Sequence, residues 1–423
     1  MLTVGSVVTL RPEKPVAGGR MLARHDGRIV LVAGAIPGET LRARIERVDR
    51  STAWASMVEV LEPHAARRRI DWDCRCGGAD YAHVAYATQL ALKADLIRDA
   101  LMRVGRHPWS EPIPLAGSPE LGYRMRCRVH TRNGPPGFFV QGTHTVCDPG
   151  PSGQLLTSTI EAIRALGAVL LEQGLASHTD IDVSENIPAD RRAVHVQVEA
   201  RAPIDAVSAL RTVPGVSGLS WSVAGHAGVE VAHGEPWVED VLRIGESAVR
   251  LRRHVRAFFQ ANRYLLPSLA ARVVAACPDG PVVDLFAGGG LFAVSLAADG
   301  RHRVTAVEGD AVATADLRAN AAQMGGAIEI HAESVERFVE AVRPVPSSTL
   351  ILDPPRSGMS RQAADGAIRL GARRVVFVSC DVATFARDVR RFVDAGYRLA
   401  SVEGIDLFPN TSHVEVLAVL DRA

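Results

Sequence analysis

The sequence is poor in lysine, aromatic residues and cysteine, and no stretch of it is apolar for long. Lys14 and Lys93 are its only lysines, so arginine carries nearly all of the positive charge. Its six cysteines show no paired spacing, which argues against a disulfide scaffold and leads us to expect a reducing, cytoplasmic location. No segment has the length of a membrane span, and residues 1–10 lack the pattern of a signal peptide, so no membrane partner is expected.

The net charge of +1 does not by itself indicate a nucleic-acid-binding protein, but the arginines are unevenly distributed. One cluster has a single acid, Glu246, among Arg243, Arg250, Arg252, Arg253, Arg256 and Arg263. A second cluster has no acid among Arg124, Arg126, Arg128 and Arg132. A single cluster is usually a solvated face, whereas two clusters beside one active-site entrance favour contacts with phosphate.

A chain of 423 residues predicts two or three domains, and residues 1–65 have the pattern of an all-β domain. Turns rich in Gly, Asp and Pro separate four short strand patterns: Ser6–Leu10, Arg28–Val32, Thr40–Ile45 and Trp54–Val58. Four strands, with a fifth that the pattern does not locate, fit a small barrel of the oligonucleotide-binding (OB) type. The segment Ala35-Ile-Pro-Gly-Glu39 and the alternating basic strand after it resemble a TRAM domain, which implies RNA binding.

Residues 66–245 begin with a cysteine-rich segment, in which Cys74 and Cys76 precede Gly77-Gly78. This spacing suggests a metal or iron–sulfur site. An amphipathic helix follows, with its apolar stripe at Leu90, Ile97, Leu101 and Val104. The remaining patterns alternate between strands and short helices, so we expect an α+β region that recognises the substrate.

Residues 246–423 alternate between strands and helices, which predicts an α/β domain with a doubly wound parallel sheet. A strand at Pro281–Phe286 runs into the glycine-rich turn Ala287–Phe292, where the backbone can approach a ligand. Glu308 lies 20 residues after Gly288, at the spacing of a carboxylate that binds ribose hydroxyls. These features are compatible with a nicotinamide enzyme and with an S-adenosylmethionine (SAM) enzyme.

Two strand ends favour SAM. The sequence Asp284-Leu-Phe-Ala-Gly-Gly-Gly290 resembles motif I of class I methyltransferases, in which an acid of the strand precedes the glycines. A later strand ends in Asp353-Pro-Pro-Arg356, whose prolines turn the chain out of the sheet. Arg356 stands where many amino-group methyltransferases carry an aromatic residue, which argues against N-methylation.

The apolar run Val375–Val378 predicts a buried strand that breaks at Ser379-Cys380, so we expect the Cys380 thiol at the carboxyl edge of the sheet, where open α/β sheets bind ligands. Taken alone, it is more typical of a buried structural thiol. A thiolate that adds to C6 of uracil makes C5 nucleophilic, and a base must then remove the C5 proton. The segment Asp406–Glu415 links the last two strand patterns and brings a candidate base, Glu415, to the same edge.

Together these motifs resemble the RNA uracil-5-methyltransferase family across essentially the whole chain. The matching segments are Phe258–Asn262, Asp284–Gly290, Glu308, Arg318–Asn320, Asp353–Arg356, Ser379–Asp388 and Asp406–Glu415. The resemblance implies that Cys380 is the nucleophile and Glu415 the base. The SAM contacts expected are Gln260, Phe286, Gly288, Glu308, Asp353 and Asn320, and the RNA contacts expected are Phe258, Arg124 and Arg126.

The sequence departs from the family in its cysteine-rich region and beside the nucleophile. Cys76 matches one ligand of a four-cysteine site, but Ile70, Ala79 and Ser152 stand at the other positions. Because two thiols cannot complete such a site without Cys127 or Cys147, we predict no iron–sulfur cluster and no metal. Asp381 stands where the family has Asn, and its charge is expected to raise the pKa of the Cys380 thiol.

The sequence therefore predicts a monomeric, SAM-dependent 5-methyluridine synthase with an N-terminal TRAM barrel, an α+β middle region and a Rossmann-like methyltransferase domain. The TRAM barrel favours 23S rRNA as the substrate, and a T-loop uridine of tRNA is the alternative. A different class, an RNA-binding relative without turnover, stays open, although the intact Cys380 and Glu415 argue against it. No protein partner is expected.

Overall fold

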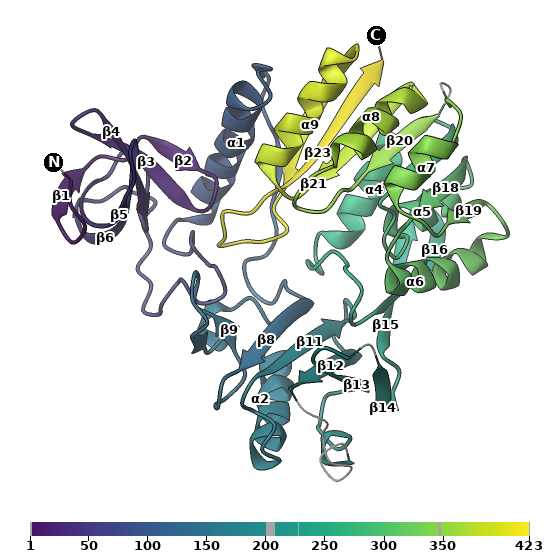
Figure 1. Cartoon of the computed structure of the whole chain (residues 1–423), viewed down its shortest axis with the longest axis horizontal. Coiled ribbons are helices and arrows are strands. Elements are labelled where there is room, and N and C mark those ends of the chain that lie inside the picture. The colour runs from purple at the N-terminus through teal and green to yellow at the C-terminus, as the bar shows by residue number, and fades with distance from the viewer. Residues whose placement is uncertain (1, 200–207, 227, 346–347, 423) are drawn as a thin grey trace.

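The computed structural model describes residues 2–199, 208–226, 228–345 and 348–422. It contains an N-terminal barrel, a middle α+β region and a C-terminal α/β domain (Figure 1). Helix α1 (Tyr86–Arg103) lies between the barrel and the C-terminal sheet and contacts both. The three parts therefore meet around the segment that follows the barrel.

The barrel is one six-stranded sheet in the order β1-β5-β6-β4-β3-β2. Its strands are β1 (Val7–Leu10), β2 (Lys14–Val16), β3 (Arg20–His25), β4 (Arg28–Ala33), β5 (Thr40–Val48) and β6 (Thr52–Glu62). All four predicted strands are present. Strand β3 was not located from the sequence because Met21, Leu22 and Ala23 are buried in succession, which hides the alternation that marks a half-buried strand.

The middle region is a five-stranded sheet in the order β14-β13-β12-β11-β8, covered by α2 (Thr157–Glu172). Its strands are β8 (Arg126–Thr131), β11 (Thr179–Glu185), β12 (Arg192–Val198), β13 (Gly218–Val223) and β14 (Val229–Gly234). A short hairpin, β9 (Phe138–Phe139) and β10 (Val146–Cys147), lies beside β8. Leu166 of α2 packs with Ile181 and Val194 of the sheet.

The C-terminal domain is built on an eight-stranded sheet in the order β19-β18-β17-β20-β21-β23-β22-β7, shown with its helices in Figure 1. Its own strands are β17 (Gly280–Leu285), β18 (His302–Val307), β19 (Ile328–His331), β20 (Thr349–Leu352), β21 (Arg374–Ser379), β22 (Tyr397–Ile405) and β23 (Glu415–Arg422). The helices are α4 (Leu266–Ala276), α5 (Leu291–Ala298), α6 (Ala311–Ala321), α7 (Val335–Ala341), α8 (Arg361–Leu370) and α9 (Val382–Asp394).

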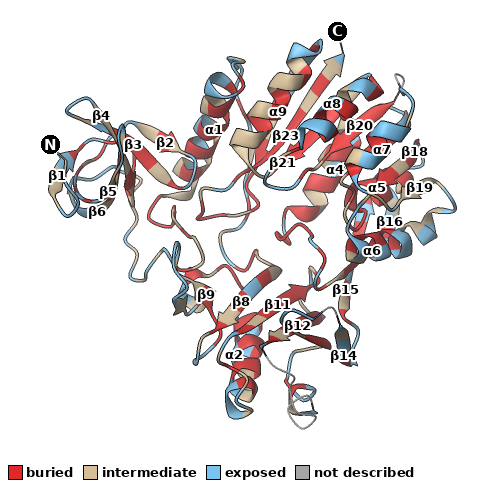
Figure 2. Ribbon diagram, in the orientation of Figure 1, coloured by how far each residue is buried: buried red, intermediate tan, exposed pale blue. Residues whose placement is uncertain are grey.

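The order of these strands decides where the catalytic side chains meet. Strands β17, β18, β19, β20 and β21 are parallel, so their carboxyl ends share one edge. Strand β23 is antiparallel and lies between β21 and β22, so its first residue reaches that same edge. The central strands are buried throughout (Figure 2), as expected for a sheet covered on both faces.

Segments outside residues 246–423 complete this domain. Strand β7 (Leu115–Ala116) pairs with Gly404 and Ile405 of β22, and Ile97 of α1 belongs to the same core as the helices of the sheet. The hairpin of β15 (Trp237–Ile244) and β16 (Ser247–His254) packs on the domain, and the predicted boundary at residues 245–246 falls in its turn.

One disulfide links two distant segments. Cys76 and Cys147 are bonded, with their Cα atoms 5.9 Å apart, and the bond joins the cysteine-rich segment to strand β10. Spacing did not predict this pair because 71 residues separate the two cysteines. Cys74, Cys127, Cys277 and Cys380 are free thiols. Among the residues that the structure describes, no helix is long and apolar enough to cross a membrane.

Candidate active site

Cys380 and Glu415 lie side by side at the carboxyl edge of the sheet. Ser379, the last residue of β21, pairs with Val416 of β23, so Cys380 and Glu415 are the next residues outward on two adjacent strands. Glu415 is buried, and its Oε1 atom has no hydrogen-bond partner. The edge therefore holds a thiol and a carboxyl oxygen that is available to a ligand.

Burial and charge both act on this pair. Burial, followed by the neighbouring carboxyls of Glu415 and Asp353, raises the pKa of the Cys380 thiol to about 12, and Arg356 opposes this rise. Burial also raises the pKa of Glu415 well above its usual range, with a further contribution from Asp353. The uncharged forms of both groups are favoured, and Arg356 is the neighbour that favours their ionised forms.

The sequence did not indicate the role of Arg356, which was considered only as the replacement of an aromatic residue. The sequence feature that could have indicated this role is the position of Arg356 directly after Pro354-Pro355, on the loop that follows β20, the strand that pairs with β21. Asp381 was expected to raise the pKa of the thiol, but its carboxylate caps α9 by accepting hydrogen bonds from the amides of Ala383 (3.0 Å) and Thr384 (2.8 Å).

The glycine-rich turn after β17 has the shape of a nucleotide-binding turn. Phe286 has φ of 67°, which is unusual for a residue with a side chain, and Gly288 has φ of 56°. The amide of Gly288 donates to Glu308 Oε2 (2.8 Å), which fixes the end of β18 against the turn. A Cβ atom at Gly288 would meet no atom within 4 Å, whereas at Gly290 it would meet Leu317 Cδ1 at 2.7 Å. Gly290 therefore permits packing, and Gly288 leaves space for a ligand.

The acidic groups around this turn fit SAM. Neither carboxyl oxygen of Asp284 has a hydrogen-bond partner although the side chain is fully buried, and burial raises its pKa well above the usual range. Gln260 is hydrogen-bonded to Asp353 and lowers the pKa of that carboxyl, but burial raises the pKa to about 7. The turn supplies open space, and Asp284, Glu308 and the Gln260–Asp353 pair supply polar groups around it, as a SAM site requires.

Two of the predicted contact residues are used within the protein. Asn320 donates to the carbonyl oxygens of Arg252 and Gly289 (both 2.8 Å) and accepts from the amide of Arg252 (2.8 Å). Its amide therefore stabilises the glycine turn through the carbonyl oxygen of Gly289. Arg124 donates to Gln154 Oε1 (2.8 Å) and to the carbonyl oxygen of Arg126 (3.1 Å), so its guanidinium is largely occupied.

Phe258 and Arg126 lie beside each other, with the Phe258 ring exposed and Arg126 partly buried. The Phe258 side chain is 66% exposed, which is unusual for so large an apolar group, and the Arg126 guanidinium lies 6.0 Å from its ring centre. The Nε atom of Arg126 is buried without a hydrogen-bond partner. An exposed ring beside an unsatisfied cation suits an unstacked base and its phosphate.

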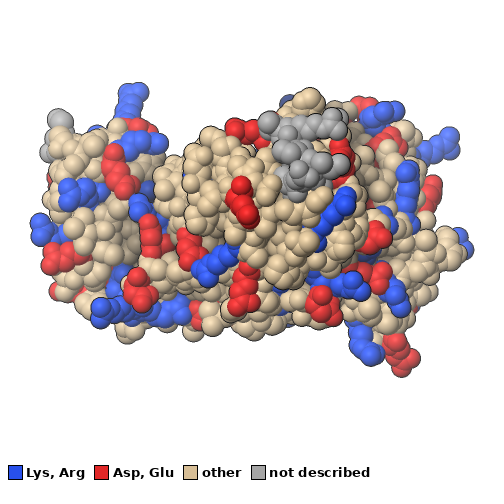
Figure 3. All heavy atoms as spheres, turned by 90° about the horizontal axis from the view of Figure 1, so that it is seen from below, with Lys and Arg blue, Asp and Glu red and all other residues tan. Residues whose placement is uncertain are grey.

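Most other members of the two arginine clusters are paired, so the argument from clustering alone was too strong. The ion pairs are Arg128–Asp182, Arg132–Asp180, Arg250–Glu239, Arg252–Asp316, Arg253–Asp240 and Arg263–Glu185. These acids come from other segments, which a count along the chain does not include. Basic and acidic side chains are interspersed on the face shown in Figure 3, without a continuous basic stripe on its visible part.

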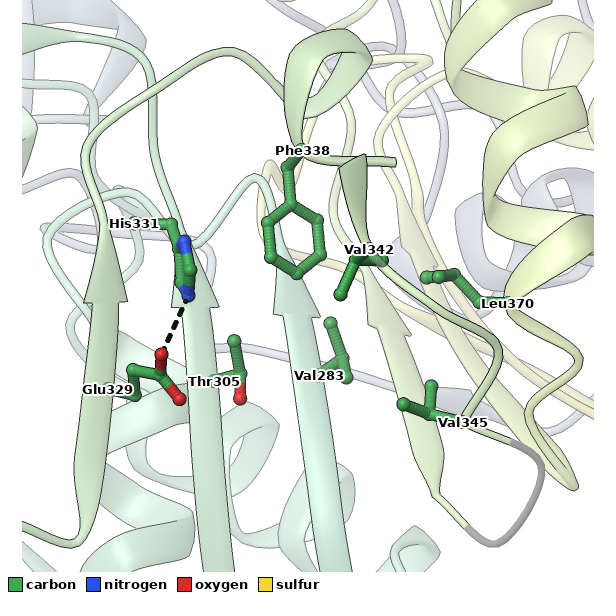
Figure 4. Close-up of a pocket in the computed structure, with 8 residues that line it drawn as sticks. All are labelled: Val283, Thr305, Glu329, His331, Phe338, Val342, Val345 and Leu370. Carbon is green, nitrogen blue, oxygen red and sulfur yellow. Dashed lines mark hydrogen bonds and ion pairs between the residues drawn. The ribbon is translucent and has the colours of Figure 1, made fainter. Parts of the chain in front are cut away.

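A separate pocket lies against the sheet between β17, β18, β19 and the segment around α7 (Figure 4). It is lined by Val283, Thr305, Glu329, His331, Phe338, Val342, Val345 and Leu370, and His331 Nε2 lies 3.1 Å from Glu329 Oε1. Neither Cys380 nor Glu415 lines it. The pocket is therefore separate from the site formed by Cys380 and Glu415.

The cysteine-rich segment does not fit a four-thiolate iron–sulfur cluster. Cys76 is bonded to Cys147, Ala79 has no ligand atom, and the Ser152 hydroxyl donates to the carbonyl oxygen of Pro149 (2.7 Å). Within the described ranges, no group of three or more His, Cys, Asp or Glu side chains is arranged to hold a metal ion.

The fold and the glycine turn define a SAM-dependent methyltransferase of class I, and the comparisons identify its family. Residues 205–423 match the family model described as tRNA (Uracil-5-)-methyltransferase, and residues 2–58 match the TRAM domain. The chain belongs to this family of RNA (uracil-5-)-methyltransferases, enzymes that use SAM to methylate C5 of uracil in RNA. The predicted TRAM domain and α/β methyltransferase fold are confirmed.

Similar proteins align along nearly the whole chain. The 23S rRNA (uracil(1939)-C(5))-methyltransferase RlmD of Pseudomonas entomophila is 31% identical over 99% of this chain and 95% of its own. An uncharacterized RNA methyltransferase of Thermosynechococcus vestitus is 28% identical over 98% of both chains. The structure of Pyrococcus abyssi tRNA (uracil-54, C5)-methyltransferase with S-adenosyl-L-homocysteine superposes with a TM-score of 0.77, covering 97% of this chain and 99% of that one. At 22% identity, this last likeness shows the shared fold alone.

Proposed function

We propose that this enzyme methylates a uridine of 23S rRNA at C5, through a covalent bond between Cys380 and C6 of the base, with Glu415 as the base that removes the C5 proton. The observation that carries the proposal is the pairing of β21 with β23, which sets Cys380 beside a buried carboxyl with an unpartnered oxygen. The TRAM domain and the full-length similarity to RlmD of Pseudomonas entomophila support ribosomal RNA as the substrate.

The reaction begins with loss of the Cys380 proton to solvent, which Arg356 favours. The thiolate Sγ then adds to C6, and the C5–C6 π electrons move toward O4, which makes C5 nucleophilic. When bound, SAM would supply the methyl group to C5, and the electron pair of its broken sulfur–methyl bond would stay on sulfur. Ionised Glu415 removes the C5 proton, the C5–C6 double bond re-forms, and Sγ leaves as a thiolate. The raised pKa of Glu415 makes its ionised form a stronger base than a solvated carboxylate.

Other residues bind and orient the two reactants. Asp284, Glu308, the turn at Gly288 and the Gln260–Asp353 pair would hold SAM. Phe258 stacks on the extruded base, and Arg126 contacts its phosphate. The enzyme uses no iron–sulfur cluster, because the cysteine-rich segment offers too few thiolates.

The test is methyl transfer from labelled SAM to total RNA, followed by mapping of the methylated nucleotide. We expect 5-methyluridine in 23S rRNA, and a label found only in a tRNA T-loop would identify the alternative substrate. Cys380→Ala should abolish transfer. Glu415→Gln should accumulate a protein–RNA adduct that resists denaturant, because methylation precedes the blocked elimination. Full activity of Cys380→Ala would end the covalent mechanism.

Iron content tests the proposal about the cluster. Protein purified without oxygen should lack the visible absorbance of a cluster and contain far less than one iron per chain. Near-stoichiometric iron with that absorbance would overturn it.

A further inference from the structure

The loop that leads into the base has an unusual conformation at its centre. Residues 406–414 join β22 to β23, and Glu415 follows them directly. Asn410, in the middle of the loop, has φ of 66°, a left-handed conformation that asparagine adopts more readily than other residues with a side chain. Contacts on both sides of Asn410 fix this turn of the loop.

Those contacts come from residues 68–89, far from the loop in sequence. The buried Gln89 of α1 binds Asn410 twice: its Oε1 accepts from the Asn410 amide (2.9 Å), and its Nε2 donates to Asn410 Oδ1 (2.8 Å). Arg68 also donates to Asn410 Oδ1 (2.8 Å). The carbonyl oxygen of Asn410 accepts from the amide of Tyr81 (2.9 Å). The backbone of Asn410 is therefore bound on both sides by one segment.

Two further contacts hold the loop on either side of Asn410. Lys93 Nζ lies 2.6 Å from Asp406 Oδ1 and 3.1 Å from the carbonyl oxygen of Phe408, and the side chains of Lys93 and Asp406 are fully buried. Asp80 accepts from both the amide (2.7 Å) and the hydroxyl (2.8 Å) of Ser412. A buried ion pair is weak evidence for stability, because desolvation offsets much of its attraction, so a role in fixing geometry is the more informative interpretation.

The contacts are selective for the half of the site that carries the base. Cys380 is held by β21 and by α9, whose cap is Asp381, and the glycine turn is held by Glu308 and Asn320. None of these elements belongs to residues 68–93. The hydrogen bonds and ion pair from this segment therefore act on the loop that leads to Glu415, and not on β21, the cap of α9 or the glycine turn.

We infer that Gln89, through its clamp on Asn410, and Lys93, through its buried pair with Asp406, are positioning residues that orient Glu415 for removal of the C5 proton. The inference rests on the proposed function, since it assigns these residues to one step of that mechanism. In this chain the cysteine-rich segment and α1 thus serve the elimination step, although none of their side chains touches the reacting atoms.

The distinguishing measurement is the amount of denaturant-resistant protein–RNA adduct at a time when the wild type has turned over. Gln89→Leu should lower kcat on the order of 100-fold, as expected for a misplaced catalytic group, while adduct accumulates as in Glu415→Gln. The Kd for SAM should not change, because the contacts that hold the glycine turn come from Glu308 and Asn320. Gln89→Glu, which keeps the acceptor for the Asn410 amide, should recover part of the turnover.

Two controls make the result specific. Asp99→Asn on the same helix removes ion pairs with Lys14 and Arg103 that do not involve the loop, so it should not accumulate adduct. Ser412→Ala removes one hydrogen bond to Asp80 and should give a smaller shift in the same direction, even if Gln89→Leu folds poorly. Wild-type turnover in Gln89→Leu, or loss of turnover without adduct in both this variant and Ser412→Ala, would overturn the inference. Activity of Cys380→Ala would instead refute the proposed function.

Discussion

Replacing Arg356 with Met should make the Cys380 thiol less reactive by raising its pKa further. The thiol pKa is already raised to about 12, and Arg356 is the neighbour that opposes this rise. A hydrogen bond to a charged group contributes roughly 1.5–3 kcal/mol, and because Arg356 is exposed we take the lower end. About 1.4 kcal/mol corresponds to one pKa unit, so the thiolate fraction should fall about tenfold at any pH below the pKa.

Alkylation of Cys380 by iodoacetamide measures this fraction directly, since only the thiolate reacts. Peptide mass spectrometry separates Cys380 from Cys74, Cys127 and Cys277, the other free thiols. Because the pKa is raised, the rate should increase about tenfold per pH unit between pH 7 and pH 9, without a plateau. The Met variant should give a parallel line about tenfold lower.

Arg361→Met is a matched control, because Arg361 is exposed on α8 and pairs with Asp365. It should leave the alkylation rate unchanged. A plateau below pH 9 in the wild type would show that the thiol pKa is not raised. Equal rates for the wild type and Arg356→Met would show that the guanidinium does not act on Cys380.

Three further predictions concern other parts of the chain. His83 is buried, with its Nε2 3.1 Å from the carbonyl oxygen of Ala35, and burial lowers its pKa from 6.5 to about 4. Neutral His83 therefore contributes at most about 3 kcal/mol to the unfolding free energy above pH 6.5. This contribution is lost as the pH falls toward 4. His83→Phe should therefore reduce the loss of unfolding free energy between pH 7 and pH 5 in urea titrations. Gly290→Ala should lower Tm, because its Cβ atom would meet Leu317. Gly288→Ala should weaken SAM binding, measured by calorimetry, with a smaller loss of Tm. A larger loss of Tm in Gly288→Ala, with SAM binding weakened in Gly290→Ala instead, would contradict the roles of the two glycines. Phe258→Ala should weaken RNA binding about tenfold in a filter assay without lowering Tm, as expected for loss of one stacked base.

The features that the sequence predicted well depend on local patterns. The strand that ends at Asp284 with its glycine turn, and the strand that ends at Cys380, are each marked by a run of apolar residues and an abrupt break. Parallel strands share a carboxyl edge, so these patterns also predicted that the two sites face the same side. The position of Glu415 depended on the further expectation that the last two strands meet at that edge, which the pairing of β21 and β23 bears out.

The features that were missed depend on contacts between distant segments. The Cys76–Cys147 bond and the acids that pair with the arginine clusters join residues that are far apart in sequence. Asn320 matched a cofactor contact by its position, but its amide is used to hold the glycine turn. Residue type and spacing indicate which groups a site contains, and they do not indicate which of those groups are already occupied.

The place of β23 in the sheet has a consequence for how the protein is made. It is the last strand along this sequence, yet it lies between β21 and β22. During synthesis, the edges of β21 and β22 that pair with β23 therefore stay unpaired until residues 415–422 have been made. Unpaired edges of this kind favour aggregation. Because Glu415 is the first residue of β23, the strand that closes the sheet also brings in the proposed base, so we expect a nascent chain to gain activity only when its sheet is complete.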